Sequence, residues 1–266
     1  MTITKQEYRD IYKERDIRLT SAKSKICDAQ PTLHIEVDQH QHNVTKGKVL
    51  YENDEIAGKL KRTIVANTFF WMDSHDDVHV PGIFNKSIAE NVNKNGRSLI
   101  SHLQDHVFQI RGRVGRPIAF YEKEMIWRQL GHARNGSTVA LIMESEIDRE
   151  LDRSVYDEYK NDFIDQHSVQ MRYITIDVAM NDSQFKTEYA NWQEVYPRLG
   201  NKAKADAAGK FYIVREADLL EVSCVLMGSN RLTPVLTNPK ANASDDIEKI
   251  DISKLLHTYK QTLNNN

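Results

Sequence analysis

Residues 168–178 read SVQMRYITIDV, and apolar and polar side chains alternate along most of this stretch. A period of two places successive side chains on opposite faces of a sheet, so the stretch predicts a β-strand. Residues 61–70 (KRTIVANTFF) and 219–227 (LLEVSCVLM) are expected to be strands as well, and residues 138–143 (TVALIM) are apolar enough for a strand that is buried on both faces. Strands therefore dominate the expected fold.

Shorter elements fill the intervals between these strands. Further strands are expected at residues 32–37, 98–101, 118–121 and 212–214. Apolar residues at helical spacing predict helices at 85–93 and 152–164, within 181–210, and close to the N-terminus. Residues 107–117 (VFQIRGRVGRP) are rich in Gly and Arg and are expected to form a loop. The pattern lacks the regular strand–helix alternation of a doubly wound fold and predicts an α+β, mainly β, barrel or sandwich with flanking helices.

The chain has 266 residues, enough for one substantial domain with appendages. Composition divides it into a polar, partly helical N-terminal extension (1–30), a main domain (31–236) and a polar C-terminal tail (237–266). We expect residues 181–210 to be a helical insertion in the main domain, and the N-terminal helix to be an appendage rather than part of the core.

Charge and motif content exclude several classes of protein. Lys and Arg number 36 against 38 Asp and Glu, a net charge of −2, which argues against direct nucleic-acid binding and against a polybasic membrane binder. No apolar run approaches the roughly 20 residues of a membrane helix, and the N-terminus lacks a signal-peptide core. Cys27 and Cys224 are too few for a disulfide framework, so a reducing cytoplasm is expected. No glycine-rich nucleotide loop occurs, and no cofactor is expected.

Three positions carry candidate chemistry. His102 and His106 lie where a short apolar strand ends, and strand ends commonly present active-site residues. Ser168 opens a strand directly after His167, and a serine hydroxyl becomes a nucleophile when an imidazole accepts its proton. Glu221 interrupts an otherwise apolar strand, so it either faces solvent or orients a histidine. From the residues alone, these positions indicate a hydrolase.

Four blocks in the same order resemble the prohead maturation proteases of tailed phages. VHVPGIFNKSI (78–88) is similar to the "pGaF…s" signature of that family, and SLISHLQDH (98–106), followed by VGRP, is similar to its strand–His–loop segment. QHSVQMRY (166–173) resembles the nucleophile strand "hSiGf", and READLLEVSCVLMGSN (215–230) resembles the ending "eaeLlEvSvV..pan". The resemblance covers about residues 60–235.

The resemblance implies a serine protease with an assemblin-like β-barrel and flanking helices, related to the maturation proteases of herpesviruses. Ser168 matches the nucleophile, His106 the base and Glu221 the acidic third member. His102 is the alternative base, and His167 is the alternative third member, since the herpesvirus relatives use a second histidine. It implies cleavage of scaffold and major capsid protein, and of the chain itself, inside the assembling prohead in the bacterial cytoplasm. Self-association is left open. Oxyanion donors are expected from backbone amides or from nearby arginines, namely Arg111, Arg113 and Arg116.

Departures from the family pattern support an alternative. The usual glycine two residues after the nucleophile is Gln170, the usual Asp after the histidine is Val107, and the usual Pro-Ala pair is Gly228-Ser229. A catalytically degenerate protease fold that acts as a scaffold or capsid-assembly protein is therefore a second hypothesis.

A third hypothesis is a metal-dependent hydrolase. Its ligands would come from His75, Asp77 and His79, or from the cluster of His34, His40 and His42. The sequence lacks the HExxH pattern, so a metal site is not the primary expectation.

Overall fold

The computed structural model describes residues 3–24, 55–56 and 58–236. All of them belong to one compact unit formed by residues 1–41 and 52–236, whereas a second unit (42–51 and 237–266) contains no described residue. The expected strand at 32–37, the histidines between 34 and 42, Cys27 and the C-terminal tail lie outside the described residues. The domain boundaries at 30/31 and 236/237 therefore stay predictions.

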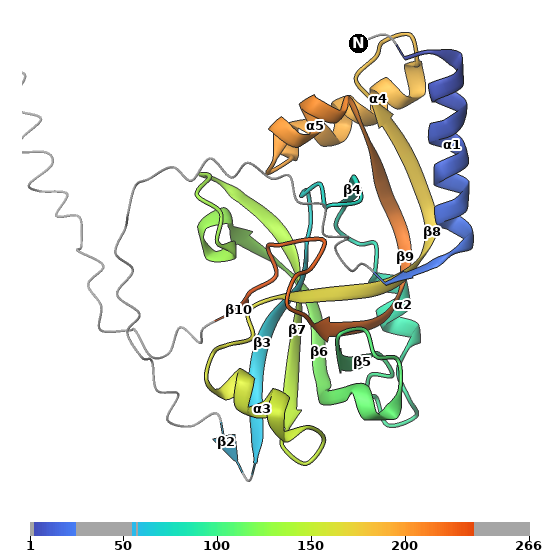
Figure 1. Ribbon diagram of the computed structural model, residues 1–266. Helices are drawn as coiled ribbons and strands as arrows, with labels where there is room; N and C mark the ends of the chain where they lie inside the picture. The colour runs from blue at the N-terminus through green and yellow to red at the C-terminus, as the bar shows by residue number, and fades with distance from the viewer. Residues whose placement is uncertain (1–2, 25–54, 57, 237–266) are drawn as a thin grey trace, which may run out of the picture. The chain divides into compact units, whose positions relative to one another are not determined.

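Ten strands, five α-helices and three short 3₁₀ turns make up the described structure (Figure 1). In chain order they are α1 (Lys5–Thr20), β1 (Ala22–Ser24), β2 (Glu55–Ile56), β3 (Lys59–Thr68), β4 (Asp77–His79), α2 (Asn85–Glu90), β5 (Ser101–Gln104), η1 (Ile110–Gly112), β6 (Arg113–Ile126), η2 (Trp127–Leu130), β7 (Ser137–Asp148), α3 (Arg153–Lys160), β8 (His167–Met180), α4 (Lys186–Val195), η3 (Tyr196–Arg198), α5 (Lys202–Ala208), β9 (Lys210–Cys224) and β10 (Val235–Leu236).

All ten strands belong to one mixed sheet. The main order is β1-β8-β9-β5-β6-β7-β3-β10, with β2 beside β3 and β4 beside β9. The pairs β4–β9 and β5–β9 are parallel, and the others are antiparallel. Within the described residues, the end strands β1 and β10 do not pair with each other, so the sheet is open. The expectation of a mainly β, α+β fold is confirmed, and the expectation of a closed barrel is not met by this sheet.

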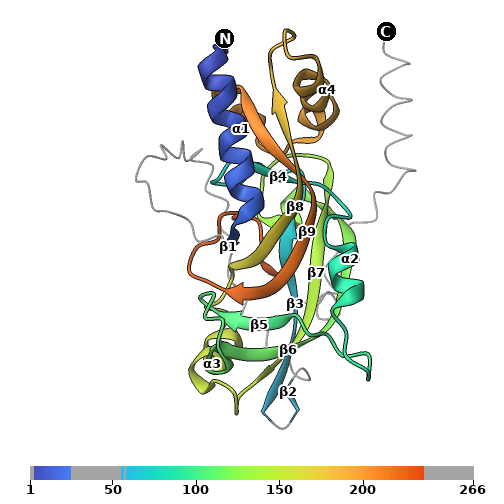
Figure 2. The same cartoon turned by 90° about the vertical axis from the view of Figure 1, so that its right-hand side faces the viewer.

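Strands β8 and β9 form the longest pairing around the site and bend strongly along their length (Figures 1 and 2). Three register shifts interrupt their ladder, between residues 170 and 176 of β8. Such irregularities bend a strand and increase its local twist. The bend allows β9 to pair with β4 along its first half and with β5 along its second half.

Three expected elements differ from the structure. The strands expected at 212–214 and 219–227 are one strand, β9, and the strand expected at 98–101 begins only at Ser101. The Gly/Arg segment is not all loop, because β6 already begins at Arg113. Gly115 lies within this strand and not in a loop. A Cβ at this position would lie 2.7 Å from the carbonyl oxygen of Glu146 and 3.2 Å from Nδ1 of His102. This glycine permits close strand packing rather than a turn.

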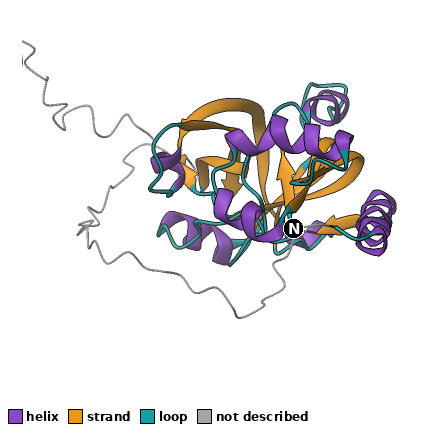
Figure 3. Ribbon diagram, turned by 90° about the horizontal axis from the view of Figure 1, so that it is seen from above, coloured by secondary structure: helices purple, strands orange, loops and turns teal. Residues whose placement is uncertain are grey.

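Helices are distributed around the strands, as Figure 3 shows. α4 and α1 pack against β8, and α2 packs against β9. Ile11 of α1 is 7% exposed and belongs to the main hydrophobic core, so the N-terminal helix is part of the packed fold and not an appendage. Among the described residues, no helix combines the length and the apolar character that a membrane span requires.

Candidate functional site

Three strands that carry the candidate residues are neighbours in the sheet. β9 lies between β8, which holds Ser168, and β5, which leads into His106. In the register, Ser168 is directly opposite Ser223, and Glu221 is directly opposite Ser101. The expectation that these distant segments meet in one sheet is confirmed. Opposite residues on adjacent strands have Cα atoms about 4.5–5.5 Å apart, so their side chains are within reach of one another.

Alternation along the strands separates two faces of the sheet at this point. Paired residues share a face, and Ser168 pairs with Ser223 while Gln170 pairs with Glu221. These four side chains therefore point to one side of the sheet, which we call the site face. His167 and Cys224 point to the opposite side, where Val222 and Cys224 join the hydrophobic core. The two neighbours His167 and Ser168 therefore cannot serve the same side of the sheet.

His106 reaches the site face through an unusual turn. Asp105 and His106 both have positive φ angles, of 48° and 57°. The amide of Asp105 donates to the carbonyl oxygen of Cys224 at 3.0 Å, which ties the turn to the end of β9. The turn directs the imidazole back over β9, where Nδ1 lies 2.5 Å from Oε1 of Glu221. The structure thus brings together two of the three expected residues.

Both members of this pair are removed from solvent. The side chain of Glu221 is 0% exposed and that of His106 is 2% exposed. A carboxylate without solvent requires hydrogen bonds to both oxygens. Nδ1 of His106 satisfies Oε1, and the hydroxyl of Ser223 donates to Oε2 at 2.6 Å.

Ser223 is a functional candidate that the sequence analysis missed. Its Oγ also accepts a hydrogen bond of 3.0 Å from the amide of His106, so it touches both the acid and the base. The available signal was spacing, because a residue two positions after Glu221 in a strand shares its face.

The contact between nucleophile and base is not made in this structure. Among the described residues, the buried Nε2 of His106 has no hydrogen-bond partner, so it makes no hydrogen bond with Oγ of Ser168. Ser168 is 5% exposed and lies opposite Ser223, whose Oγ is 3.0 Å from the His106 amide. Catalytic hydrogen bonds are often longer in resting enzymes and tighten when substrate binds.

The alternative histidines lie in the core. Nδ1 of His102 pairs with Oγ of Ser145 at 2.9 Å, and its Nε2 pairs with the hydroxyl of Tyr159 at 3.0 Å. That hydroxyl also pairs with Nε2 of His167 at 2.8 Å, and Nδ1 of His167 donates to the carbonyl oxygen of Thr233 at 2.9 Å. With both ring nitrogens of each histidine engaged behind the sheet, neither His102 nor His167 can replace His106 on the site face.

The environment of these two histidines keeps them neutral. Burial, with a smaller contribution from the nearby His167, holds the pKa of His102 well below its usual value. Burial lowers the pKa of His167 to about 4, although its hydrogen bond to the Thr233 backbone acts in the opposite direction. Burial also raises the pKa of Tyr159 well above its usual value. The chain of hydrogen bonds is therefore an uncharged structural network.

The proposed metal ligands have structural roles. Asp73, Asp77 and His79 are buried with ligand atoms within 4.8 Å of one another, whereas His75 is not in this group. Oδ1 of Asp73 accepts hydrogen bonds from the backbone amides of His75 and Asp77, at 2.8 and 3.0 Å, and so closes the turn before β4. Nδ1 of His79 pairs with Oδ1 of Asn67 at 3.0 Å.

Asp77 is the acceptor of an ion pair. Arg18 of α1 donates to Oδ1 of Asp77, and the hydroxyl of Tyr173 donates to Oδ2 at 2.5 Å. The cluster thus attaches α1 to the sheet, and the engagement of both Asp77 oxygens by Arg18 and Tyr173 does not favour the metal-dependent hydrolase.

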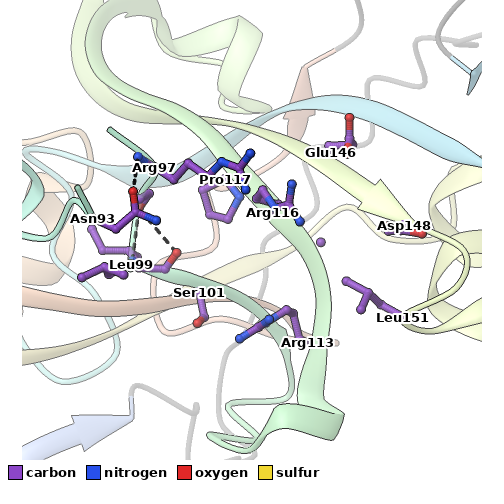
Figure 4. A pocket seen from close by; sticks show the side chains of 13 residues that line it. Asn93, Arg97, Leu99, Ser101, Arg113, Arg116, Pro117, Glu146, Asp148 and Leu151 are labelled. Carbon is purple, nitrogen blue, oxygen red and sulfur yellow. Dashed lines mark hydrogen bonds between the residues drawn. The ribbon is translucent and has the colours of Figure 1, made fainter. Parts of the chain in front are cut away.

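A pocket of about 290 Å³ lies beside the site, on the far side of β5 (Figure 4). Its lining includes Ser101, the cross-strand neighbour of Glu221, and the basic residues Arg97, Arg113 and Arg116. Arg113 extends toward Ser101 in this view. Two of the three arginines expected near the histidine thus line this pocket, and Arg111 is exposed on η1.

Gln170 occupies the position where the family pattern has a glycine. It is paired with Glu221 across the strands and is half-buried on the site face. Its Oε1 is buried and has no hydrogen-bond partner in the part of the chain that the structure describes. The side chain therefore adds an unsatisfied acceptor to the same face that holds the unsatisfied Nε2 of His106.

Comparison with known proteins gives no relative. No protein-family model matches the chain, and neither the curated proteins nor the solved structures contain a match.

Proposed function

We propose that the chain is a serine endopeptidase with Ser168 as nucleophile, His106 as base and Glu221 as the acid that orients the base. The buried pair of His106 and Glu221, with a 2.5 Å contact, carries this proposal. Residues 106, 168 and 221 have no local reason to converge, yet a serine on the adjacent strand shares the face of this pair. A carboxylate, an imidazole and a serine in this order are the components of a triad.

The geometry supports a defined proton path. Glu221 accepts from Nδ1, which leaves the lone pair of Nε2 as the base. As Oγ of Ser168 attacks the scissile carbonyl carbon, its proton moves to Nε2, and Glu221 stabilises the resulting imidazolium. The tetrahedral intermediate then collapses, the C–N bond breaks, and Nε2 gives the proton to the leaving amine. Water hydrolyses the acyl-serine ester by the same path.

The mechanism requires one local rearrangement. Nε2 of His106 has no hydrogen-bond partner among residues 3–24, 55–56 and 58–236, so a rotamer change at Ser168 or His106 must bring the two groups together. The buried and unsatisfied Nε2 favours that change, because a buried polar atom without a partner costs free energy.

The biological setting rests on the resemblance in sequence. Four blocks resemble prohead proteases and occur in the order of that family, and the last three of them contain His106, Ser168 and Glu221. We propose that the substrates are phage scaffold and major capsid protein, cleaved inside the assembling prohead in the bacterial cytoplasm, and that the sheet is a variant of the assemblin-like barrel.

A degenerate, non-catalytic protease fold is the second candidate. The missing contact to Nε2 of His106 and the replacement of a glycine by Gln170 favour it. In this case the chain would act as a scaffold or capsid-assembly protein.

A Ser168→Ala variant tests the first candidate. The variant should lose all cleavage of the co-expressed capsid protein, and a fluorophosphonate probe that labels wild-type Ser168 should leave it unmodified. Ser168 is buried, so removal of its hydroxyl should cost about 1–3 kcal/mol of stability, which circular dichroism and thermal unfolding of the variant measure. Mass spectrometry of new protein termini and of the probe adduct measures both results.

Ser137→Ala is a matched control, because Ser137 also opens a strand but lies on β7. It should cleave and react like the wild type. Full cleavage by a folded Ser168→Ala variant would favour the scaffold candidate instead.

A further inference from the structure

We propose that Ser223 is a positioning residue of the catalytic site, which fixes Glu221 and the backbone of His106 through one hydroxyl. This inference rests on the proposed function and adds a fourth residue to it. Ser223 does not touch the reacting atoms. It acts through the acid and the base, both of which it contacts.

The hydroxyl of Ser223 has a defined direction. Its Oγ accepts from the amide of His106 at 3.0 Å, and an amide can only donate. The hydroxyl proton is therefore free to donate to Oε2 of Glu221, which lies 2.6 Å away. Because Ser223 is 0% exposed, water does not compete for either bond.

The first effect of this hydroxyl is on the carboxylate. Glu221 is fully buried, and its two oxygens have two donors, the imidazole of His106 and the hydroxyl of Ser223. A hydrogen bond to the charged form of a buried group favours that form and its orientation. The two donors therefore hold the carboxylate in line with Nδ1, as a base-orienting acid requires.

The second effect is on the backbone of the base. Asp105 and His106 have positive φ angles, which non-glycine residues adopt rarely and at a cost in energy. Such a turn persists when surrounding contacts determine it. The bond from the His106 amide to Ser223 is one such contact, and it holds the imidazole over β9.

Ser223 is not itself the nucleophile. It has no solvent access, its proton is donated to Glu221, and its oxygen is the acceptor for His106. Ser168, directly across on β8, is 5% exposed, compared with 0% for Ser223.

Three variants of full-length protein test the proposal, with the fluorophosphonate as probe. Ser223→Ala should lower the maximal labelling rate at Ser168 by about 10- to 100-fold, as expected for loss of a hydrogen bond to a charged group, with the probe affinity unchanged. Ser223→Thr keeps the hydroxyl and should stay within about threefold of the wild type. Ser223→Cys keeps a side chain of similar size whose thiol is only a weak donor, so its labelling rate should lie between those of Ser223→Ala and Ser223→Thr. Ser223→Cys takes the place of Ser223→Ala if the alanine variant does not fold.

Ser145→Ala is the matched control. It removes a hydroxyl of the same kind from a buried histidine, His102, on the opposite side of the sheet. It should lower the melting temperature and leave the labelling rate unchanged. A merely structural role of Ser223 would give the same pattern as Ser145.

A second measurement does not depend on catalysis. In ¹⁵N-histidine-labelled protein, the Nδ1 proton of His106 should resonate far downfield because of its short contact with Glu221, and Ser223→Ala should move it upfield. Wild-type labelling rate together with an unchanged His106 signal in Ser223→Ala would overturn the proposal. Absence of probe on wild-type Ser168, with the His106 signal still dependent on Ser223, would instead refute the proposed protease while the positioning role stands.

Discussion

A glutamate can occupy a completely buried position of β9 because its environment supplies two donors. Glu221 is 0% exposed, and its contacts with His106 and Ser223 satisfy one oxygen each. Removing either donor leaves a buried acceptor unpaired, which costs about 1–3 kcal/mol or more for a charged group. At this scale, stability and the proposed catalysis depend on the same three side chains.

The two histidines of the 98–106 segment should respond differently to substitution. His106→Ala removes the base and should lower the rate of probe labelling at Ser168 by about a thousandfold or more. His102→Asn should leave the rate within a few-fold, because His102 contacts Ser145 and Tyr159 on the opposite side of the sheet. The measurement is the pseudo-first-order labelling rate of folded protein.

Circular dichroism spectra of both variants control for unfolding. A larger loss of rate in His102→Asn than in His106→Ala, with both proteins folded, would show that the base is misassigned.

Sequence reasoning reached part of the site and missed the rest for physical reasons. Glu221 could be predicted because a carboxylate inside an apolar strand needs a partner or solvent. Ser223 was missed although its spacing of two from Glu221 places it on the same face of β9, because a serine is compatible with buried and exposed positions alike. His106 was preferred to His102 only through the family resemblance, because the left-handed turn at 105–106 that directs its side chain onto the site face was not anticipated.

At the scale of elements, one buried ion pair attaches α1 to the sheet. Arg18 near the end of α1 contacts Asp77 of β4, Glu14 one turn earlier, and the carbonyl oxygen of His75. Arg18 is 4% exposed and Asp77 is 0% exposed, so the pair is shielded from water.

Replacing Arg18 by Met should destabilise the protein by about 3–5 kcal/mol, because it leaves the buried carboxylate of Asp77 without its cation. Urea unfolding curves measure this loss. Arg15→Ala is the matched control on the same helix, since Arg15 pairs with Asp16 at 2.7 Å on the surface and should contribute at most about 1 kcal/mol. Equal losses in the two variants would contradict a structural role for the buried pair.

β8 could be predicted because apolar and polar residues alternate along much of it, whereas β3 is buried at each of its last five positions and was expected without such alternation. The start of β6 could not, because Gly115 was interpreted as a loop residue although it permits close packing against His102. The pairing of β1 with β8 joins residues about 150 apart in sequence, and no local pattern encodes such a contact. The strand order, with β1 and β10 at its two ends, likewise depends on contacts between residues that are distant in sequence.

At the scale of the whole molecule, the sheet separates reactive from inert histidines. His106 lies on the site face, and the network of His102, Tyr159 and His167 lies behind the sheet. This network joins β5, α3 and β8, so its protonation should affect the stability of the whole fold and not only of one element.

Stability should therefore fall in mild acid. The pKa of His167 is lowered by burial from 6.5 to about 4, and that of His102 is also lowered. Both histidines bind protons more readily when unfolded, so their contribution is complete above about pH 6.5 and is lost as the pH falls toward 4. His167 alone should reduce the free energy of unfolding by about 2 kcal/mol between pH 7 and pH 5, and His102 should add to this loss. Urea unfolding at these two pH values measures the loss.

In ¹³C-histidine spectra of the folded protein, the ring signals of His102 and His167 should stay constant down to about pH 5. Titration of these signals near pH 6.5, or a free energy of unfolding that does not change between pH 7 and pH 5, would show that the two rings are not buried in this network.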